Sequence, residues 1–239
     1  MRGVPLKGWH PSHIPEENNY RERKKIMVKR FVCAAMTVMM AATLFTGCVK
    51  VVKIGEEGAL TGQVKFNPGD SVEEIWDSAV LPEFEGKAVD INEVLEKANG
   101  DLTSLGEEAG GVKTKSATSY NYCVKLEGAT VASVDKDSFY GTAVLTVPGY
   151  EGDINITCQI GQYKGSSVRD AQTIIKFADF TNQTEWGQIN TTMLQRVDET
   201  VVKPVYDDLA EGATVDLIGC FTADSAKEMV ITPVELTVK

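Results

Sequence analysis

The residue types best suited to binding a small polar molecule gather between residues 161 and 183. The candidates are Lys164, Ser166, Arg169, Asp170, Asn182 and Gln183. The first four lie in a connection that contains two glycines, and the last two precede an apolar helical pattern. The free amides at the start of that helix would attract a carboxylate, a phosphate or sugar hydroxyls. These residues therefore form a candidate ligand site.

The same residues also have a purely structural interpretation, which their common use in proteins favours. Asn182 or Thr181 would cap the helix, and Arg169 would pair with Asp170 or Asp179. The glycines would then only make turns. Substitution of Arg169 and Asn182 separates the two interpretations, because a site predicts a lost ligand response at unchanged stability, whereas a structural role predicts lost folding.

The chain beyond residue 47 contains few of the residue types that enzymes use for catalysis. Both histidines, His10 and His13, lie before it, so no imidazole is present there to activate a nucleophile or to bind zinc. Acidic pairs such as Asp135 and Asp137 lack the spacing of an EF-hand and most often form a solvated surface. We expect no catalytic residue, no metal site, no cofactor and no enzymatic activity. A hydrolase that uses two carboxylates is the least favoured alternative.

Composition and charge narrow the possible partners. The chain has 239 residues and is 43% hydrophobic, as folded proteins are. Sixteen Lys and Arg stand against thirty-one Asp and Glu beyond residue 47. This acidic balance argues against nucleic acid as a partner, since affinity for a polyanion depends on cations. The acidic charge does not argue against a neutral sugar, on which several aromatic residues could stack. These are Tyr120, Tyr122, Phe139, Tyr140 and Tyr163.

The segment 27–47 has the organisation of a secretory signal peptide. Two cations, Lys29 and Arg30, precede an uncharged run that is too short to span a bilayer, and small residues follow before Cys48. The residues Leu44 to Cys48 resemble the bacterial lipoprotein consensus, which implies acylation of Cys48, for example by palmitate, and attachment to the membrane. Residues 1–26 are interpreted as an upstream extension from a mis-assigned start codon, or as a long n-region. Residues 48–68 would form the lipid anchor and tether, with an edge strand near 63–66.

The rest of the chain divides into a small helical subunit, 69–111, and a barrel domain, 112–239. In the first part, Asp70 and Asp90 each begin a capping box, Pro82 is expected to end the first helix, and Asn99-Gly100 closes the second. In the second part, alternating apolar residues predict three strands, a helix and two strands. Their ranges are 120–134 with a bulge at Gly128, 140–147, 154–160, a helix over 184–203 ended by Pro204, 213–221, and 228–238 with Pro233 at an edge or bulge.

This order predicts an α+β fold, an OB-like five-stranded Greek-key barrel of order β-β-β-α-β-β, in preference to another α+β sheet. In such a barrel the first and fourth strands are neighbours. Cys123–Cys220 is therefore the first disulfide to test in an exported protein. Cys158 would be left over, because three cysteines cannot all pair within one chain. Buried free thiols are the favoured interpretation of all three.

Five segments together resemble one bacterial family. They are the lipobox, GEEGALTGQVKF, INITCQIGQYKGSSVRD, FADFTNQTEWGQIN and GCFTADSAKEMVITPVELTV. The family is that of predicted periplasmic lipoproteins, known only as a domain of unknown function, and the resemblance covers almost all of the chain after Cys48. Its members are often encoded beside sugar-type ABC importers, which implies an accessory role there. Lys164-Gly165-Ser166 stands where an Arg-Gly-Thr-like phrase is expected, and this weakens any inference of bidentate anion binding at Lys164.

The sequence thus predicts a cell-membrane lipoprotein on the extracytoplasmic face, periplasmic if the cell has an outer membrane. We expect a non-enzymatic module that binds a small sugar-like ligand or assists a sugar-type ABC importer, with importer components as partners. The alternative is a docking protein of the envelope that needs no ligand and uses its acidic surface and helical subunit as the interface.

Overall fold

The computed structural model describes residues 68–113 and 117–239, with side chains from Val72 onward. The signal peptide, Cys48, the tether and the strand expected near 63–66 lie outside the described residues. Within the described ranges, no helix is long and apolar enough to cross a membrane.

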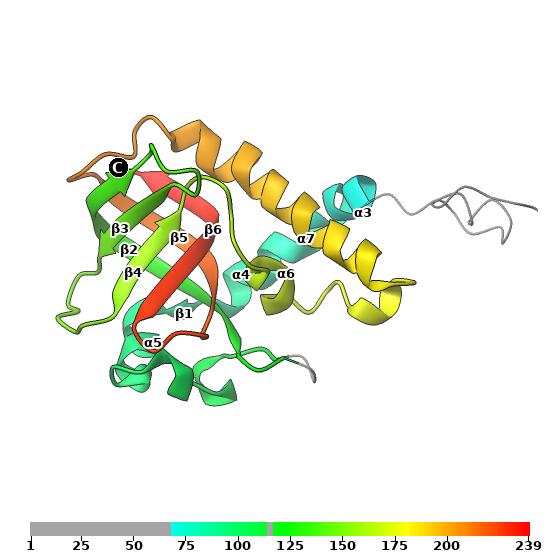
Figure 1. Ribbon diagram of the computed structural model, residues 1–239, viewed down its shortest axis with the longest axis horizontal. Helices are drawn as coiled ribbons and strands as arrows, with labels where there is room; N and C mark the ends of the chain where they lie inside the picture. The colour runs from blue at the N-terminus through cyan, green and yellow to red at the C-terminus, as the bar shows by residue number, and fades with distance from the viewer. Residues whose placement is uncertain (1–67, 114–116) are drawn as a thin grey trace, which may run out of the picture. The chain divides into compact units, whose positions relative to one another are not determined.

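Five strands form a closed barrel (Figure 1). They are β2 (Asn121–Asp135), β3 (Thr142–Thr146), β4 (Asn155–Gln159), β5 (Thr214–Thr222) and β6 (Glu228–Val238). The order is β2-β3-β4-β6-β5, and a second pairing of β2 with β5 closes the ring. Only β4 and β6 pair in parallel within the ring. Three strands, a helix and two strands therefore close as the OB-like barrel that the sequence predicts.

The long strand β2 can pair with both β3 and β5 because it is irregular in the middle. Gly128 has a φ of +70°, and the register with β5 shifts between Leu126 and Ala129. The Gly128 N–H donates to the Asp216 carboxylate over 2.7 Å, so the unpaired backbone group at the bulge is satisfied. The predicted bulge is confirmed. Pro233 on β6 likewise lies opposite Gly219, where the register with β5 is irregular, so its predicted position at a bulge is confirmed as well.

Helix α7 (Gln183–Val197) continues into two short helical turns, η5 (Asp198–Val202) and η6 (Lys203–Val205), which contact β6, while α7 itself extends beyond the barrel alongside the N-terminal helices (Figure 1). Its buried side chains are Ile189, Met193 and Val197, as the helical spacing predicts. Helix α7 contacts the N-terminal helices, where Arg196 binds the Asp77 carboxylate with both N···O distances at 2.9 Å.

The first helical segment is longer than the sequence predicts. It comprises α3 (Pro68–Ile75), η1 (Trp76–Val80) and α4 (Leu81–Lys87) without an intervening loop. Pro82 does not end the helix as expected, because it lies in the first turn of α4, directly after the π-helical turn η1. A proline is tolerated in a first turn because the N–H it lacks would be unpaired there.

The second helix, α5 (Ile91–Ala98), follows the sequence closely. Asp90 accepts the Asn92 N–H over 2.9 Å as its N-cap, and Asn99 ends the helix in the left-handed conformation with a φ of +46°. A two-residue strand, β1 (Val89–Asp90), runs parallel to β2 just before it. Two short 3₁₀ turns follow, η2 (Leu102–Ser104) and η3 (Glu107–Ala109).

One hydrophobic core runs through these helices and the barrel. Phe84, Leu95 and Leu102 from the helical part belong to the same buried cluster as Val124, Met229 and other barrel residues. Tyr122 stacks on Phe221 with ring centroids 5.1 Å apart. The boundary between a helical subunit and a barrel domain near residue 112 stays a prediction.

Candidate functional site

The connection between β4 and α7 borders a pocket. The connection contains α6 (Ser167–Ala171) and the 3₁₀ turn η4 (Phe177–Asp179). A cavity of about 750 Å³ opens between this connection, the start of α7 and the residues before β2. Its lining consists of Val112, Ala117, Arg169, Asp170, Gln172, Thr173, Ile175, Lys176, Phe177, Gln183, Trp186 and Gly187. A pocket of this size and mixed character suits a small molecule.

Trp186 and Arg169 form the centre of the pocket wall. The guanidinium carbon of Arg169 lies 4.5 Å from the centre of the Trp186 ring system, and its Nη1 donates to the Trp186 carbonyl oxygen over 3.3 Å. Phe177 meets the same indole edge-on with ring centroids 6.0 Å apart. The stacked guanidinium and indole therefore present a planar, partly apolar surface beside a fixed positive charge.

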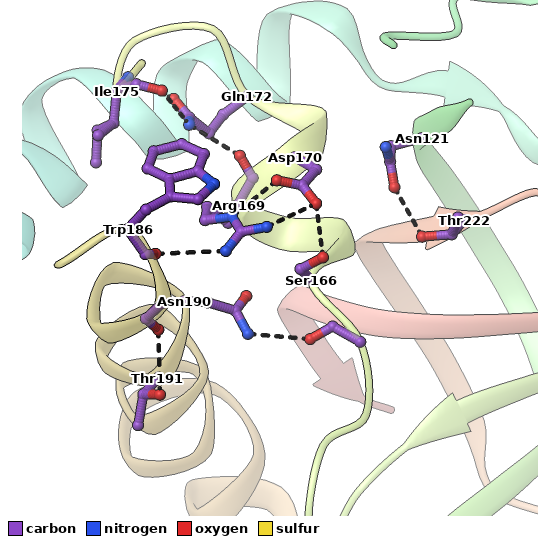
Figure 2. A network of polar contacts seen from close by, with 12 residues as sticks. Asn121, Ser166, Arg169, Asp170, Gln172, Ile175, Trp186, Asn190, Thr191 and Thr222 are labelled. Carbon is purple, nitrogen blue, oxygen red and sulfur yellow. Dashed lines mark hydrogen bonds and ion pairs between the residues drawn. The ribbon is translucent and has the colours of Figure 1, made fainter. Parts of the chain in front are cut away.

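Asp170 holds the guanidinium in place through a bidentate pair. Arg169 Nε donates to Oδ1 over 2.7 Å and Nη2 donates to Oδ2 over 2.9 Å (Figure 2). Ser166 Oγ adds a third hydrogen bond to Oδ2 over 2.6 Å. Three of the five Arg169 N–H bonds are used once the Trp186 carbonyl is included, which leaves two for a ligand. Asp170 thus acts chiefly as the residue that orients Arg169.

Gln172 stiffens the loop that forms the rim of the pocket. Its side chain is only 5% exposed. Nε2 donates to the carbonyl oxygens of Arg169 and Ile175 over 2.9 and 2.7 Å, and Oε1 accepts the Ile175 N–H over 2.6 Å (Figure 2). A buried amide with both ends satisfied fixes the backbone on either side of it. The pocket wall is therefore held in shape by hydrogen bonds within the protein.

Two side chains of helix α4, Glu83 and Lys87, hydrogen-bond to the same loop. The Glu83 carboxylate accepts the Thr173 N–H and the Thr173 hydroxyl, and it pairs with Lys87 over 2.9 Å. Lys87 also donates to the Ala171 carbonyl oxygen. Burial acts to raise the pKa of Glu83, but the hydrogen bonds from Lys87 and Thr173 outweigh it and lower that pKa below 4.5.

The structure brings only some of the predicted residues together. Arg169, Asp170 and Gln183 line the pocket, and Ser166 joins the network behind it. Asn182 instead caps α7, because its Oδ1 accepts the Glu185 N–H over 3.0 Å. Lys164 is absent from the lining, and its Nζ lies over the Tyr140 ring, 3.5 Å from the centroid. The structural interpretation is thus correct for the Asn182 cap and for the Arg169–Asp170 pair.

Sequence reasoning predicted three of the twelve residues that line the pocket and missed nine, among them Gln172, Thr173, Phe177 and Trp186. Trp186 belongs to the helix predicted over 184–203, where it is half-buried and forms part of the pocket wall. An aromatic residue in the first turn of a helix, directly after candidate ligand residues, is the signal that could have identified it. Gln172 gave no local signal, since its role depends on the fold of the loop.

The pocket is lined by three charged side chains, those of Arg169, Asp170 and Lys176. Asp170 is the one carboxylate among the residues that line it, and it is paired with Arg169. Within the described ranges, no three His, Cys, Asp or Glu side chains are grouped so that they could hold a metal ion.

The fold and the pocket define an OB-like barrel with a small-molecule-sized cavity on the connection that leads to its helix. The chain belongs to the family described as predicted periplasmic lipoprotein (DUF2291), whose model matches residues 38–237. Membership confirms the expected extracytoplasmic, membrane-anchored location.

A solved structure has the same fold. It is described as the crystal structure of an OB-fold protein from Thermotoga maritima, with a TM-score of 0.58 and 20% sequence identity over 73% of this chain and 99% of that one. This similarity confirms the fold class. No curated protein matches the chain.

Proposed function

We propose that this lipoprotein binds a small sugar-like ligand in the Arg169–Trp186 pocket, without catalysis, and that it serves a sugar-type ABC importer as an accessory module. The observation that carries the proposal is the stacked Arg169–Trp186 pair at the wall of a cavity of about 750 Å³. An aromatic face packs against the C–H groups of a sugar ring, and the remaining guanidinium N–H groups, with Thr173 and Gln183, can hydrogen-bond its hydroxyls.

The charge of the pocket agrees with a neutral or weakly anionic ligand. Two cations, Arg169 and Lys176, stand against one carboxylate, Asp170, among the residues that line it. The chain as a whole carries a formal charge of −10. A polyhydroxylated ligand needs directed donors and acceptors more than charge, and the pocket has both kinds. Importer components and the membrane at Cys48 are the partners that the family resemblance implies.

The test is thermal unfolding of the mature lipoprotein in detergent with neutral monosaccharides, sugar phosphates, nucleosides and calcium. A ligand at a hundredfold excess over its Kd stabilises the folded state by about 2.7 kcal/mol, which raises Tm by roughly 5 to 10 °C in a domain of this size. We expect this shift with a neutral sugar. A shift with none of the four classes contradicts the proposal.

Two variants locate the site. Gln183→Ala removes an exposed side chain of the rim and is expected to reduce the ligand-induced shift while leaving the unliganded Tm unchanged. Arg169→Ala is expected to abolish the shift. Its matched control is Arg196→Ala, because Arg196 also lies over a tryptophan, Trp76, and pairs with a carboxylate, Asp77, but does not line the pocket. Equal loss of response in both arginine variants would indicate a general loss of structure.

A second candidate function is docking of an envelope protein without any ligand. The observation that favours it is the exposed aromatic pair Phe139 and Tyr140 between β2 and β3, with side chains 72% and 42% exposed. Cross-linking to the permease or solute-binding protein of a sugar-type importer, with wild type and Phe139→Ser compared, tests it. Cross-linking that is lost in Phe139→Ser, together with no ligand response, would favour docking over binding.

A further inference from the structure

Two of the three described cysteines face each other across the seam that closes the barrel. Cys123 on β2 and Cys220 on β5 are direct partners in the antiparallel register, and both are buried free thiols in this structure. Side chains of directly opposite residues leave the sheet on the same face. The two thiols therefore lie side by side on one face of adjacent strands.

The backbone hydrogen bonds show to which class of antiparallel pair these cysteines belong. The N–H and C=O of Asn121 both bond to Val112, each over 2.8 Å, so they point away from β5. The C=O of Tyr120, the residue before Asn121, accepts the Ala223 N–H over 2.9 Å, so the backbone of Tyr120 points toward the β5 side. This direction alternates along a strand, so Cys123 points its backbone groups away from β5, as Asn121 does.

Cys123 and Cys220 are consequently a non-hydrogen-bonded pair, the class in which the Cα atoms lie about 4.5 Å apart. Disulfides need Cα atoms separated by about 4.4 to 6.8 Å. The neighbouring pair of the same class on the same face, Asn121 and Thr222, already has its side chains in contact, because Thr222 Oγ1 donates to Asn121 Oδ1 over 2.7 Å. The geometry of this face therefore brings opposite side chains within bonding reach.

The pair lies beneath the helices that hold the pocket loop. Cys123 Sγ donates to the Phe84 carbonyl oxygen of α4 over 3.6 Å, and Ser167 Oγ of α6 donates to the Cys220 carbonyl oxygen over 3.1 Å. Burial raises the pKa of the Cys220 thiol well above its usual range in the packed protein. The thiolate that disulfide formation requires is thus available mainly before α4 and α6 have packed on the strands.

Cys158 cannot compete for either partner. It lies on β4, whose neighbours are β3 and β6, and its Cα partners are Ala143 and Ile231. Its side chain lies on the same face of the strand as those of Ile156 and Ile160, and all three are buried. This burial raises the pKa of the Cys158 thiol to about 12. The fold therefore selects one pairing of the three that these cysteines allow.

We propose that Cys123 and Cys220 form an inter-strand disulfide in the exported protein and that Cys158 stays a thiol. The oxidant is a disulfide of the thiol–disulfide exchange class, which is present in extracytoplasmic compartments. One cysteine thiolate attacks it to give a mixed disulfide, and the second thiolate then displaces the oxidant. The two thiols lose two protons and two electrons, and the oxidant leaves as two thiols.

Peptide mapping of the unmutated lipoprotein tests this pairing. Cells that express the full chain are quenched in acid, and the membrane fraction is denatured, alkylated with N-ethylmaleimide and digested with trypsin without reduction. Trypsin leaves the three cysteines on separate peptides, 116–125, 137–164 and 197–227. We expect 116–125 joined to 197–227, and 137–164 alkylated. Alkylation of all three peptides, or any linkage through 137–164, overturns the proposal.

Thermal unfolding with and without a reductant provides the second measurement. A disulfide that closes so long a loop constrains the unfolded chain, so reduction is expected to lower the Tm of wild type by roughly 10 °C. The matched control Cys158→Ala keeps both the linkage and the effect of reductant. Cys123→Ala and Cys220→Ala each lose both, with the remaining partner alkylated. A wild type whose Tm is indifferent to reductant contradicts the proposal.

Discussion

The Glu83 carboxylate accepts the Thr173 N–H over 2.8 Å and the Thr173 hydroxyl over 2.7 Å, although the two residues lie ninety positions apart in the chain. Glu83 belongs to α4, in the helical segment that follows the tether in sequence, and Thr173 lines the pocket. The segment nearest the lipid anchor in the described chain is thus hydrogen-bonded to the rim of the candidate site. A change at either one is therefore expected to affect the other.

Glu83→Gln tests this connection. The amide retains one acceptor oxygen but loses the charge that binds Lys87 and one of the two oxygens that hold Thr173, so we expect a loss of about 1.5 to 2 kcal/mol in the free energy of unfolding. Urea unfolding at pH 7 measures it. The matched control is Glu93→Gln, which removes only the exposed Glu93–Lys97 pair and is expected to cost about 0.3 to 0.5 kcal/mol. Equal effects of the two substitutions would contradict a special role for Glu83.

The difference in stability between wild type and Glu83→Gln is expected to depend on pH. The pKa of Glu83 is lower in the folded protein than the usual 4.5, since the hydrogen bonds from Lys87 and Thr173 outweigh the effect of burial. Its contribution is therefore fully present above about pH 4.5 and is lost as the pH falls through the folded pKa. The stability gap between wild type and Glu83→Gln should narrow below pH 4.5. A gap that widens on acidification would refute this assignment.

Asn182→Ala separates the helix cap from the ligand site. The Asn182 side chain accepts the Glu185 N–H at the start of α7, and its loss is expected to cost about 1 kcal/mol of stability. The pocket wall at Arg169 and Trp186 is left intact, so the ligand-induced Tm shift should keep its size. Calorimetric unfolding with and without ligand gives both quantities. A normal baseline Tm with a lost ligand shift would instead place Asn182 in the site.

The barrel could be predicted from the sequence because its determinants are local. Alternating apolar residues mark each strand, Gly128 marks the bulge, and the Asp90 cap and Asn99 end mark α5. Pro82 misled the prediction because the π-helical turn before it lets the helix continue, and no local pattern in the sequence specifies such a turn.

The pocket could be predicted only in part, because most of its contacts join distant segments. Arg169 and Asp170 are adjacent in sequence, so the sequence alone allows their pairing to be proposed. Helix α6 is only five residues long, too short for a helical period to appear, and the Glu83–Thr173 contact requires the tertiary fold. Lys164 lies close to Arg169 in sequence, yet its charge is directed to the Tyr140 ring instead.

Two glycines offer a matched test of packing. Gly187 lies inside α7 with nothing within 4 Å of where a Cβ would be, so Gly187→Ala is expected to stabilise the protein by about 0.5 to 1 kcal/mol. At Gly219 on β5, a Cβ would clash with Ile231 Cγ2 and lie 2.9 Å from the Thr232 carbonyl oxygen. We expect Gly219→Ala to cost about 1 to 3 kcal/mol. Opposite signs in denaturant unfolding would support this packing, and a neutral Gly219→Ala would contradict it.

Glu235 on β6 provides a pH effect opposite in sign to that of Glu83. Burial, and then the neighbouring Glu85 carboxylate of α4, raise the pKa of Glu235 above 4.5. The folded state therefore holds its proton more tightly than the unfolded chain does. The stabilisation from protonation is fully present below about pH 4.5 and is lost as the pH rises through the folded pKa.

Glu85→Gln removes the neighbouring carboxylate that helps to raise the pKa of Glu235, so it should stabilise the protein by about 0.5 kcal/mol at pH 7 and by less at pH 4. The control Glu96→Gln changes an exposed carboxylate on α5 and is expected to be neutral at both pH values. Thermal unfolding of the three proteins at pH 4 and pH 7 decides the matter. Because Glu83 and Glu235 act in opposite directions, the pH profile of wild type alone would conceal both effects, and only the variants separate them. A Glu85→Gln protein that is less stable than wild type at pH 7 would show that the two carboxylates do not repel each other in the folded state.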